Sequence, residues 1–215
     1  MKAGLVGYAQ TGKTTLFNAL TGLGMQTGAG RAAKANLGVI KVPDVRIDKL
    51  SAIFKPRKTI YAEVSLIDVP GPRTKGGGLD SATIQALREA DALVVVVRGF
   101  DAGEAPEPLR ELIDFDAELL LNDQIVVERR LERLAKEKGH DREKAVLDKC
   151  LAALNEGKSL RLIGLTEEEE REIVSYAFLS LRPVLAVVNV GEDGAGKPLP
   201  AELVAAAKDR KFEVL

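Results

Sequence analysis

Eight residues near the N-terminus have the types and the spacing of a phosphate-binding loop. The stretch Gly7-Tyr8-Ala9-Gln10-Thr11-Gly12-Lys13-Thr14 fits the pattern G-x-x-x-x-G-K-[ST]. Glycine at the two fixed positions lets the backbone curl in conformations that a Cβ would oppose, so successive N–H groups can face one anion. Lys13 would add a mobile positive charge, and the Thr14 hydroxyl would be a ligand for Mg²⁺. We therefore predict a nucleotide phosphate site.

The segments on either side of this loop support that interpretation. Ala3 to Val6 is a short apolar run typical of a buried strand, and Leu16 and Leu20 have helical spacing. Strand, glycine-rich loop and helix is the order that the motif requires, and a helix beginning at Lys13 points its positive dipole end at the phosphates. The predicted phosphate-binding residues are Gly7, Ala9, Gln10, Thr11, Gly12, Lys13, Thr14 and Thr15.

An acidic motif follows another apolar run, Ala62 to Ile67, in the stretch Asp68-Val69-Pro70-Gly71. An acid that emerges from a buried strand is either a capped strand end or a metal-site carboxylate. Beside a phosphate loop we favour the second, in which Asp68 holds Mg²⁺ through water together with Thr14. The Gly71 N–H would contact the γ-phosphate, and Lys13 and Gly71 are the predicted catalytic groups.

Two glycine-rich segments adjoin these motifs. Residues 22–35 are rich in Gly, Ala and Thr and have few large apolar side chains, so we expect a loop. In nucleotide switches such a loop closes over the γ-phosphate, although a plain connector fits the composition as well. Residues 72–78 would form the second switch segment.

A further polar pair follows the buried run Pro183 to Val188. In phosphate-loop GTPases a polar residue and an acid three positions apart after this strand recognise the nucleobase, and the acid is usually Asp. Here the spacing gives Asn189 and Glu192, so we predict that Asn189, Val190 and Glu192 contact a purine base. The longer Glu192 weakens the case for guanine, and Asn189 as a simple turn residue is the alternative.

The composition of the chain indicates its domain organisation and its cellular compartment. The 215 residues are 46% hydrophobic and 29% charged, with a net charge of -1, which suits one α/β domain with an insertion. The only cysteine, Cys150, cannot form an internal disulfide, and no apolar run approaches the ~20 residues that span a bilayer. The N-terminus reads directly into a strand rather than a signal peptide. We expect a cytoplasmic protein without a membrane partner.

The middle of the chain changes period and predicts an antiparallel helical hairpin. Leu120, Val127, Leu131 and Leu134 form one apolar stripe, and Leu147, Leu151 and Leu154 form the returning stripe after a turn at Gly139-His140-Asp141. A third helix should begin with the capping box at Thr166 and bury Ile173, Ala177 and Leu181. His140 lies at a charged tip, and no set of catalytic or zinc-binding side chains can be assembled around it or around Cys150.

These elements predict an α/β fold of the P-loop NTPase, GTPase-like class, with a mostly parallel sheet flanked by helices. The nucleotide-binding domain would comprise residues 1–113 and 182–215, and the inserted hairpin residues 114–181. The hairpin could dock a ribosome or RNA, but its Lys and Arg alternate with acids, which favours a solvated face.

A short helix, Val45 to Phe54, is expected between the two early strands, after a turn at Pro43-Asp44. It ends at Lys55-Pro56-Arg57-Lys58. These cations are either a nucleic-acid patch or a solvated turn, and the sequence favours the turn.

The chain resembles the Obg-like ATPases of the YchF type, across most of its length. The resemblance rests on Thr14-Thr15-Leu16-Phe17-Asn18-Ala19-Leu20, on Asn36 to Ile40 and Val42 to Leu50, on Val97 to Phe100, on the helix start at Glu118, on Val127 to Leu131 and on Asn189 to Glu192. It implies a GTPase-like sheet, a coiled-coil insertion, ATP preferred over GTP, and association with ribosomes.

Three features depart from that family. Ala32 aligns with the threonine of the first switch, and Thr27 could replace it only if the loop shifts. Pro72 follows Gly71 in place of a hydrophobic residue, in a shortened second switch. The C-terminal TGS domain has no counterpart in this sequence. We therefore predict an Mg²⁺-dependent ATPase switch, with GTP as the alternative nucleotide and a binding module with little hydrolysis, or a small-molecule kinase, as alternative functions.

Overall fold

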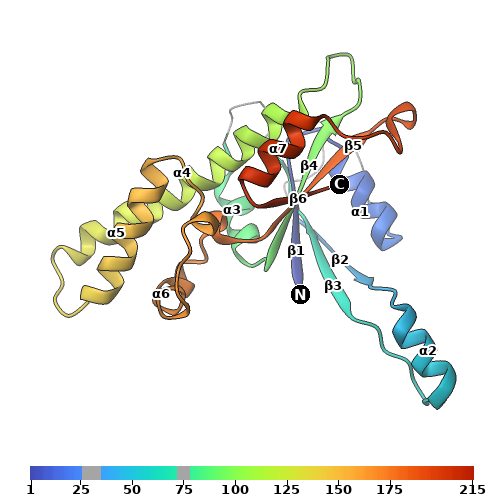
Figure 1. Ribbon diagram of the computed structural model, residues 1–215, viewed down its shortest axis with the longest axis horizontal. Helices are drawn as coiled ribbons and strands as arrows, with labels where there is room; N and C mark the ends of the chain where they lie inside the picture. The colour runs from blue at the N-terminus through green and yellow to red at the C-terminus, as the bar shows by residue number, and fades with distance from the viewer. Residues whose placement is uncertain (26–34, 72–77) are drawn as a thin grey trace.

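The computed structural model describes residues 1–25, 35–71 and 78–215. Its six strands form one sheet in the order β2-β3-β1-β4-β5-β6, and every neighbouring pair is parallel except β2 and β3 (Figure 1). The strands are β1 (Lys2–Val6), β2 (Asn36–Lys41), β3 (Glu63–Asp68), β4 (Ala92–Gly99), β5 (Val184–Val190) and β6 (Phe212–Val214). The predicted fold class, an α/β P-loop NTPase with a mostly parallel sheet, is confirmed.

Seven α-helices lie in the part of the chain that the structure describes. They are α1 (Lys13–Thr21), α2 (Val45–Phe54), α3 (Ser81–Arg88), α4 (Pro108–Leu134), α5 (Asp141–Asn155), α6 (Glu167–Ile173) and α7 (Ala201–Asp209). Asp80 caps α3 through its carboxylate, and Thr166 begins α6 with the predicted capping box. The predicted limits of α2 agree with the structure at both ends.

The central strands are buried on both faces, as their continuous apolar sequences require. Phe17 of α1 packs with Leu5 and Val96 on one face. Leu87 of α3, Leu112 and Phe115 of α4, and Leu203 of α7 belong to the larger cluster on the other face. One face of the sheet is thus covered by α1, and the other by α3, α4 and α7.

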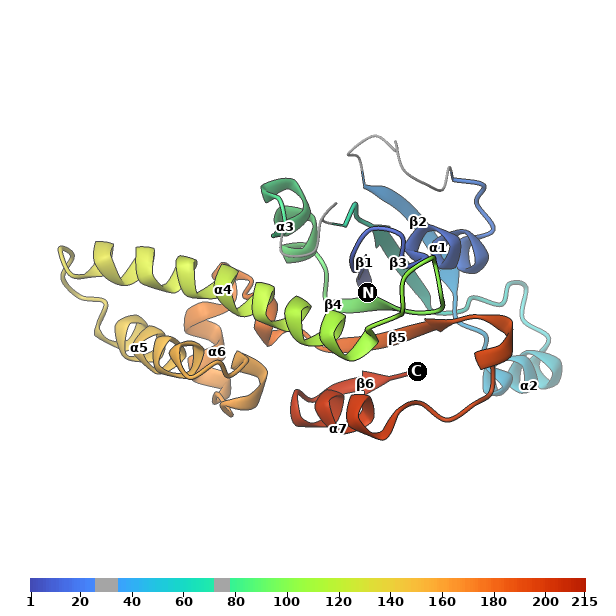
Figure 2. The same ribbon diagram turned by 90° about the horizontal axis from the view of Figure 1, so that it is seen from above.

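The helical hairpin extends to one side of the sheet, with α4 and α5 side by side (Figures 1 and 2). The predicted stripes meet in a second core, where Val127 and Leu134 of α4 pack with Leu147 and Leu154 of α5. The first part of α4 packs on the sheet and the second part on α5, so one 27-residue helix belongs to both cores. The predicted boundary at residue 114 lies within α4 and stays a prediction.

Two predicted helix limits were wrong. The helix start placed at Glu118 belongs ten residues earlier, because Pro108 occupies the first turn, where its missing N–H costs nothing. The third helix ends at Ile173, and Ala177 has a positive φ of 49°. The buried carboxylate of Asp123 on α4 accepts hydrogen bonds from the N–H groups of Leu179 (3.0 Å) and Ser180 (2.6 Å), so a long-range contact breaks the helical pattern.

The predicted loops around Thr27, Ala32 and Pro72 lie outside the described residues, which exclude 26–34 and 72–77. The proposed substitution of Thr27 for a missing threonine, and the effects of Ala32 and Pro72, therefore stay predictions.

The buried Asp123 carboxylate gives a test of this fold. Asp123→Ala leaves two buried backbone N–H groups without an acceptor, so we expect the free energy of unfolding to fall by about 2–4 kcal/mol in urea titrations. Asp148→Ala, on the exposed side of α5, is the control and should change it by less than about 0.5 kcal/mol. Equal effects of the two substitutions would contradict the proposed role of Asp123.

Candidate functional site

The loop between β1 and α1 has the backbone geometry of an anion cradle. Gly7 and Gly12 have φ of 144° and 91°, and Gln10 has φ of 64°, all in the left-handed region. A Cβ at Gly7 would collide with the carbonyl oxygen of Val96 on β4, so only glycine fits there. The first N–H groups of a helix have no helical acceptor, so the start of α1 presents donors to a ligand.

Lys13 lies at the first position of α1 and is buried within the loop. Its Nζ donates to the carbonyl oxygen of Tyr8 at 2.5 Å, and the Thr11 hydroxyl donates to the same oxygen at 3.1 Å. These two bonds fold the loop around the lysine side chain. The ammonium group is thereby held inside the loop by the loop's own backbone.

Two side chains with oxygen atoms that could bind a metal, Thr14 and Asp68, meet beside the loop. The Thr14 hydroxyl donates to Oδ2 of Asp68 at 3.1 Å, and the Asn36 side chain donates to the same oxygen at 3.4 Å. Asp68 is fully buried at the end of β3, directly beside Leu5 of β1 in the parallel register. The neighbouring ends of two parallel strands therefore bring the carboxylate to the start of α1.

The Thr14 hydroxyl and the Asp68 carboxylate are suitable ligands for the predicted Mg²⁺. Mg²⁺ prefers hard oxygen ligands and is commonly held by one or two side chains together with waters and substrate phosphates. Thr14 and Asp68 supply a hydroxyl and a carboxylate at the edge of the phosphate cradle. Within the three described ranges no group of three or more His, Cys, Asp or Glu side chains could hold a metal, so a zinc-type site is not found there.

Gly71 packs against the phosphate loop. A Cβ at this position would collide with the carbonyl oxygen of Gly7 and would lie 2.9 Å from Nζ of Lys13. The two predicted catalytic residues, Lys13 and Gly71, are therefore neighbours, and the position of Gly71 requires glycine. Their part in hydrolysis stays a prediction.

The predicted base-recognition residues divide into two groups. Asn189 lies within β5, and its side-chain amide donates to the carbonyl oxygen of Thr11 at 2.9 Å, which ties the loop to this strand. A Cβ on Gly12 would collide with that same amide. Val190 ends β5, and the exposed Glu192 begins the following 3-10 turn. Asn189 is thus hydrogen-bonded to the phosphate loop, whereas Glu192 lies in the turn that follows β5.

Sequence reasoning missed two residues of this site. Asn36, the first residue of β2, donates to Asp68, and a polar residue opening an apolar run was the available signal. The Tyr8 side chain is buried, and burial, followed by the charges of Asp114, Glu118 and Glu111, raises its pKa to about 12. The effect of these α4 acids on Tyr8 could not be predicted from the motif, in which this position is unspecified.

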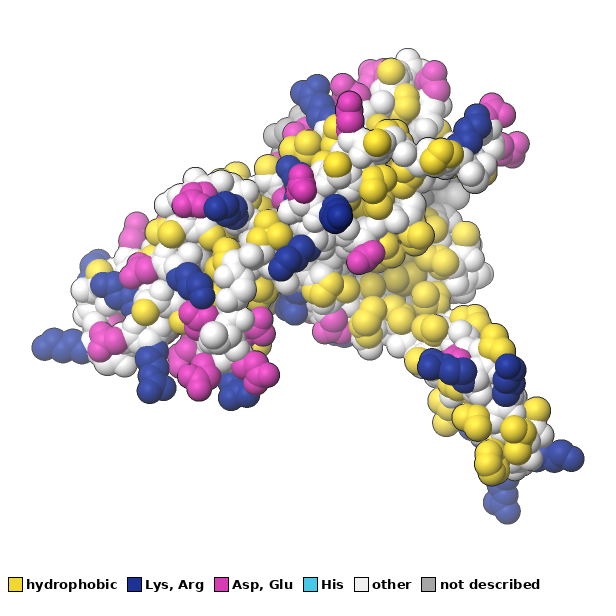
Figure 3. Space-filling view, in the orientation of Figure 1, with side chains coloured by type: hydrophobic (Ala, Val, Ile, Leu, Met, Phe, Trp, Pro, Cys, Tyr) yellow, Lys and Arg dark blue, Asp and Glu magenta, His cyan; other side chains and the backbone are white. Residues whose placement is uncertain are grey.

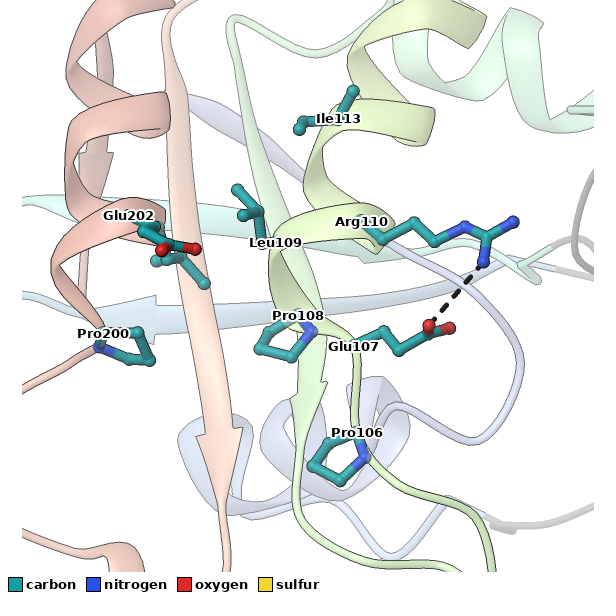
Figure 4. Close-up of a pocket in the computed structure, with 9 residues that line it drawn as sticks. Pro106, Glu107, Pro108, Leu109, Arg110, Ile113, Pro200 and Glu202 are labelled. Carbon is teal, nitrogen blue, oxygen red and sulfur yellow. Dashed lines mark ion pairs between the residues drawn. The ribbon is translucent and has the colours of Figure 1, made fainter.

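A cavity of about 420 Å³ lies elsewhere, between the N-terminal ends of α4 and α7 (Figure 4). It is lined mainly by apolar side chains, including Pro108, Leu109, Ile113 and Leu203, and the Arg110–Glu107 ion pair lies at its edge. None of its lining residues belongs to the predicted nucleotide site. The cavity therefore has no part in the chemistry predicted for the loop.

None of the helices in the described ranges combines the length and the apolar character that crossing a bilayer requires.

Comparison with known proteins agrees with the geometry of the loop. The family model described as "50S ribosome-binding GTPase" matches residues 2–130. The ribosome-binding ATPase YchF of Haemophilus influenzae is 37% identical over 210 residues, which cover 90% of this chain and 58% of that protein. The YchF protein of Bacillus subtilis is 33% identical over 230 residues, which cover 97% of this chain and 62% of that protein. The chain thus spans about three fifths of the length of these relatives.

A solved structure shows the same fold. The structure of the Schizosaccharomyces pombe YchF GTPase superposes with a TM-score of 0.75 at 24% identity, covering 100% of this chain and 72% of that one. The expected resemblance to the YchF-type proteins is confirmed by these relatives. Since the family model matches more than half of its residues, the chain belongs to the family of 50S ribosome-binding GTPases.

Proposed function

We propose that this chain is the nucleotide-binding part of a cytoplasmic molecular switch that binds ATP with Mg²⁺ and hydrolyses it slowly. The observation that carries the proposal is the hydrogen bond between the Thr14 hydroxyl and the Asp68 carboxylate, 3.1 Å long, at the edge of a glycine-shaped loop that contains Lys13. A phosphate cradle and a pair of metal donors are thus adjacent.

Each residue has a distinct task in this proposal. The N–H groups of residues 9–15 bind the phosphates, and Lys13 moves its ammonium group from the Tyr8 carbonyl toward the β/γ-phosphates. Gly71, already against the loop, brings its N–H to the γ-phosphate. Thr14 and Asp68 would hold Mg²⁺, which when bound neutralises charge on the transferred phosphoryl group.

The nucleobase is the point on which the names of similar proteins differ. The curated relatives are named ATPases, whereas the family description and the Schizosaccharomyces pombe structure use GTPase. We favour ATP because Glu192 stands where an Asp would accept the two guanine N–H groups, and its longer side chain reaches a different point. The side-chain amide of Asn189 is hydrogen-bonded to the Thr11 carbonyl oxygen, so Asn189 would contact the base from a position beside the loop.

Ribosome association follows from the same family membership and is also a proposal, because the chain spans only part of its relatives. For the hairpin of α4 and α5 the sequence left two interpretations open, a docking surface for a ribosome or RNA and a solvated face, and it favoured the solvated face. A nucleotide-binding module with little turnover remains the rival, and phosphate release separates the two.

The phosphate cradle is tested by removing its charge. Lys13→Ala deletes a charge-assisted contact worth roughly 1.5–3 kcal/mol, so ATP affinity measured by calorimetry should fall by a factor of about 10 to 150. Lys2→Ala, at the opposite end of β1, is the control and should leave affinity unchanged. Unchanged affinity in Lys13→Ala would remove the basis for the site.

Hydrolysis is tested under single-turnover conditions. Wild-type protein with Mg²⁺ should release phosphate from bound ATP, and Thr14→Ala should slow release at least about tenfold because a metal ligand is lost. Thr21→Ala, at the other end of α1, should retain the wild-type rate. Absence of release from wild-type protein, with or without ribosomes, would favour the binding module.

Nucleobase choice is tested by competition for one fluorescent nucleotide analogue. We expect ATP to displace it at a lower concentration than GTP does, because the Glu192 carboxylate is displaced by one methylene from the position that suits guanine. Preferential displacement by GTP would instead establish the alternative.

A further inference from the structure

A short arm, residues 41–62, leaves the sheet between β2 and β3. It carries α2 and returns through residues 55–62, with the N–H of Val42 bonded to the carbonyl oxygen of Ala62 at its base. Figure 1 shows α2 pointing away from the sheet, on the side opposite the α4–α5 hairpin. None of the α2 residues is buried. A helix without a buried face gains little from the fold to which it is attached.

The polar side of α2, not its apolar side, faces the rest of the arm. Ser51 is hydrogen-bonded to Thr59 at 2.5 Å, and the Tyr61 hydroxyl donates to Asp48. Ile47, Leu50, Ile53 and Phe54 follow helical spacing on another side of the helix. Leu50, Ile53 and Phe54 are 54%, 70% and 75% exposed. An apolar stripe is therefore directed away from the protein's own contacts.

The arm also concentrates positive charge. Residues 41–62 contain six Lys or Arg and two Asp, a net charge of +4 in a chain whose total is -1. Asp44 is paired with Arg46 at 2.7 Å. The remaining cations are exposed and have no ion-pair partner in the described part of the chain; they are Lys41, Lys49, Lys55, Arg57 and Lys58. Figure 3 shows these charges on the arm beside yellow apolar side chains.

The α4–α5 hairpin differs in this respect. Its cations include two that are paired with acids: Arg130 of α4 with Glu143 of α5 at 2.8 Å, and Lys149 of α5 with Glu169 of α6 at 2.9 Å. On α6 itself, Arg171 is paired with Glu167 at 3.3 Å. In Figure 3 positive and negative side chains alternate over that region. A polyanion would have to compete with these acids, whereas at the arm it would meet such competition only at Arg46.

We propose that the arm is an RNA-binding element of this protein, in which Lys41, Lys49 and Lys55 to Lys58 contact phosphates and the stripe at Ile53 and Phe54 packs on unstacked bases. RNA presents both a row of negative charges and exposed base faces, which matches the two features that the arm combines. The cations extend from the base of the arm to its tip, as contact with successive phosphates requires. The biological setting rests on the proposed ribosome association.

An anionic membrane would satisfy the charge but fits the arm less well. A membrane-surface helix carries its cations on its own polar face, opposite the apolar one. Of the arm's cations only Arg46 and Lys49 belong to α2, and Arg46 is paired with Asp44. RNA is therefore the occupant that the spread of charge along the arm and the exposed aromatic ring favour together.

The test uses a fluorescein-labelled, 20-nucleotide single-stranded RNA of mixed sequence, with binding followed by anisotropy from 50 to 300 mM KCl. The triple variant Lys55→Gln/Arg57→Gln/Lys58→Gln should bind at least about tenfold more weakly at low salt, and its salt slope should be shallower by about 2. Lys136→Gln/Lys138→Gln/Lys144→Gln removes the same charge from the hairpin and should change affinity less than about twofold. Phe54→Ser should weaken binding about fivefold or more without altering the slope.

Three results would overturn the inference. The first is that the wild-type chain does not bind the RNA, and the second is that the arm and hairpin variants lose equal affinity for it. The third is that the arm variant binds the RNA as wild-type protein does but loses binding to vesicles of phosphatidylcholine and phosphatidylserine. Binding of a fluorescent ATP analogue, unchanged in every variant, controls for folding. Co-sedimentation with purified 50S subunits separates the two proposals. If wild-type protein does not co-sediment, the ribosome part of the proposed function fails. If the arm variant co-sediments as well as wild-type protein does, the arm's role on the ribosome fails.

Discussion

The site depends on three places where the phosphate loop packs against its neighbours too closely to leave room for a Cβ. Gly7 lies against the carbonyl oxygen of Val96 on β4, Gly12 against the Asn189 amide on β5, and Gly71, after β3, against Gly7 itself. The loop is thereby fixed relative to three strands of the sheet. An anion cradle that is shaped before its ligand arrives loses little conformational entropy on binding. The glycines therefore matter for packing as much as for the loop's own dihedral angles.

The connection between the sheet and the hairpin is buried and polar. Asp116 on α4 accepts from the Ser159 hydroxyl at 3.1 Å and from Arg161 at 3.1 Å, and Arg210 of the sheet domain lies 3.5 Å from its other oxygen. A buried polar group that loses its partner destabilises the fold, so these groups favour the one arrangement of hairpin and sheet in which all of them are paired. Since α4 also belongs to both apolar cores, one continuous helix joins the hairpin to the sheet.

Local patterns in the sequence predicted the parts of the molecule that local physics determines. The strand–loop–helix unit at Gly7 to Thr15, the limits of α2 and the paired stripes of α4 and α5 follow from spacing alone. Contacts between distant residues were not predictable. The end of α6 depends on a carboxylate 56 positions before Leu179, and the contribution of Asn36 depends on antiparallel pairing with β3. Periodicity predicted the α2 helix but not the exposure of its apolar stripe, because periodicity does not tell whether a partner covers it.

Acidic side chains lie near Tyr8 of the phosphate loop, and arginines offset part of their charge. Three acids on α4 contribute to raising the pKa of this tyrosine, so negative charge lies near a loop that we propose to bind phosphates; the acids are Asp114, Glu118 and Glu111. Glu111 accepts from the N–H of Arg98 at 2.8 Å and lies 3.9 Å from its guanidinium, and Asp114 lies 3.7 Å from Arg110. These arginines offset two of the three charges. Tyr8 itself adds no negative charge, because a tyrosine is neutral at pH 7 at its ordinary pKa of about 10 as well as at the raised value of about 12. Lys13 is therefore the only charged side chain among residues 7–14.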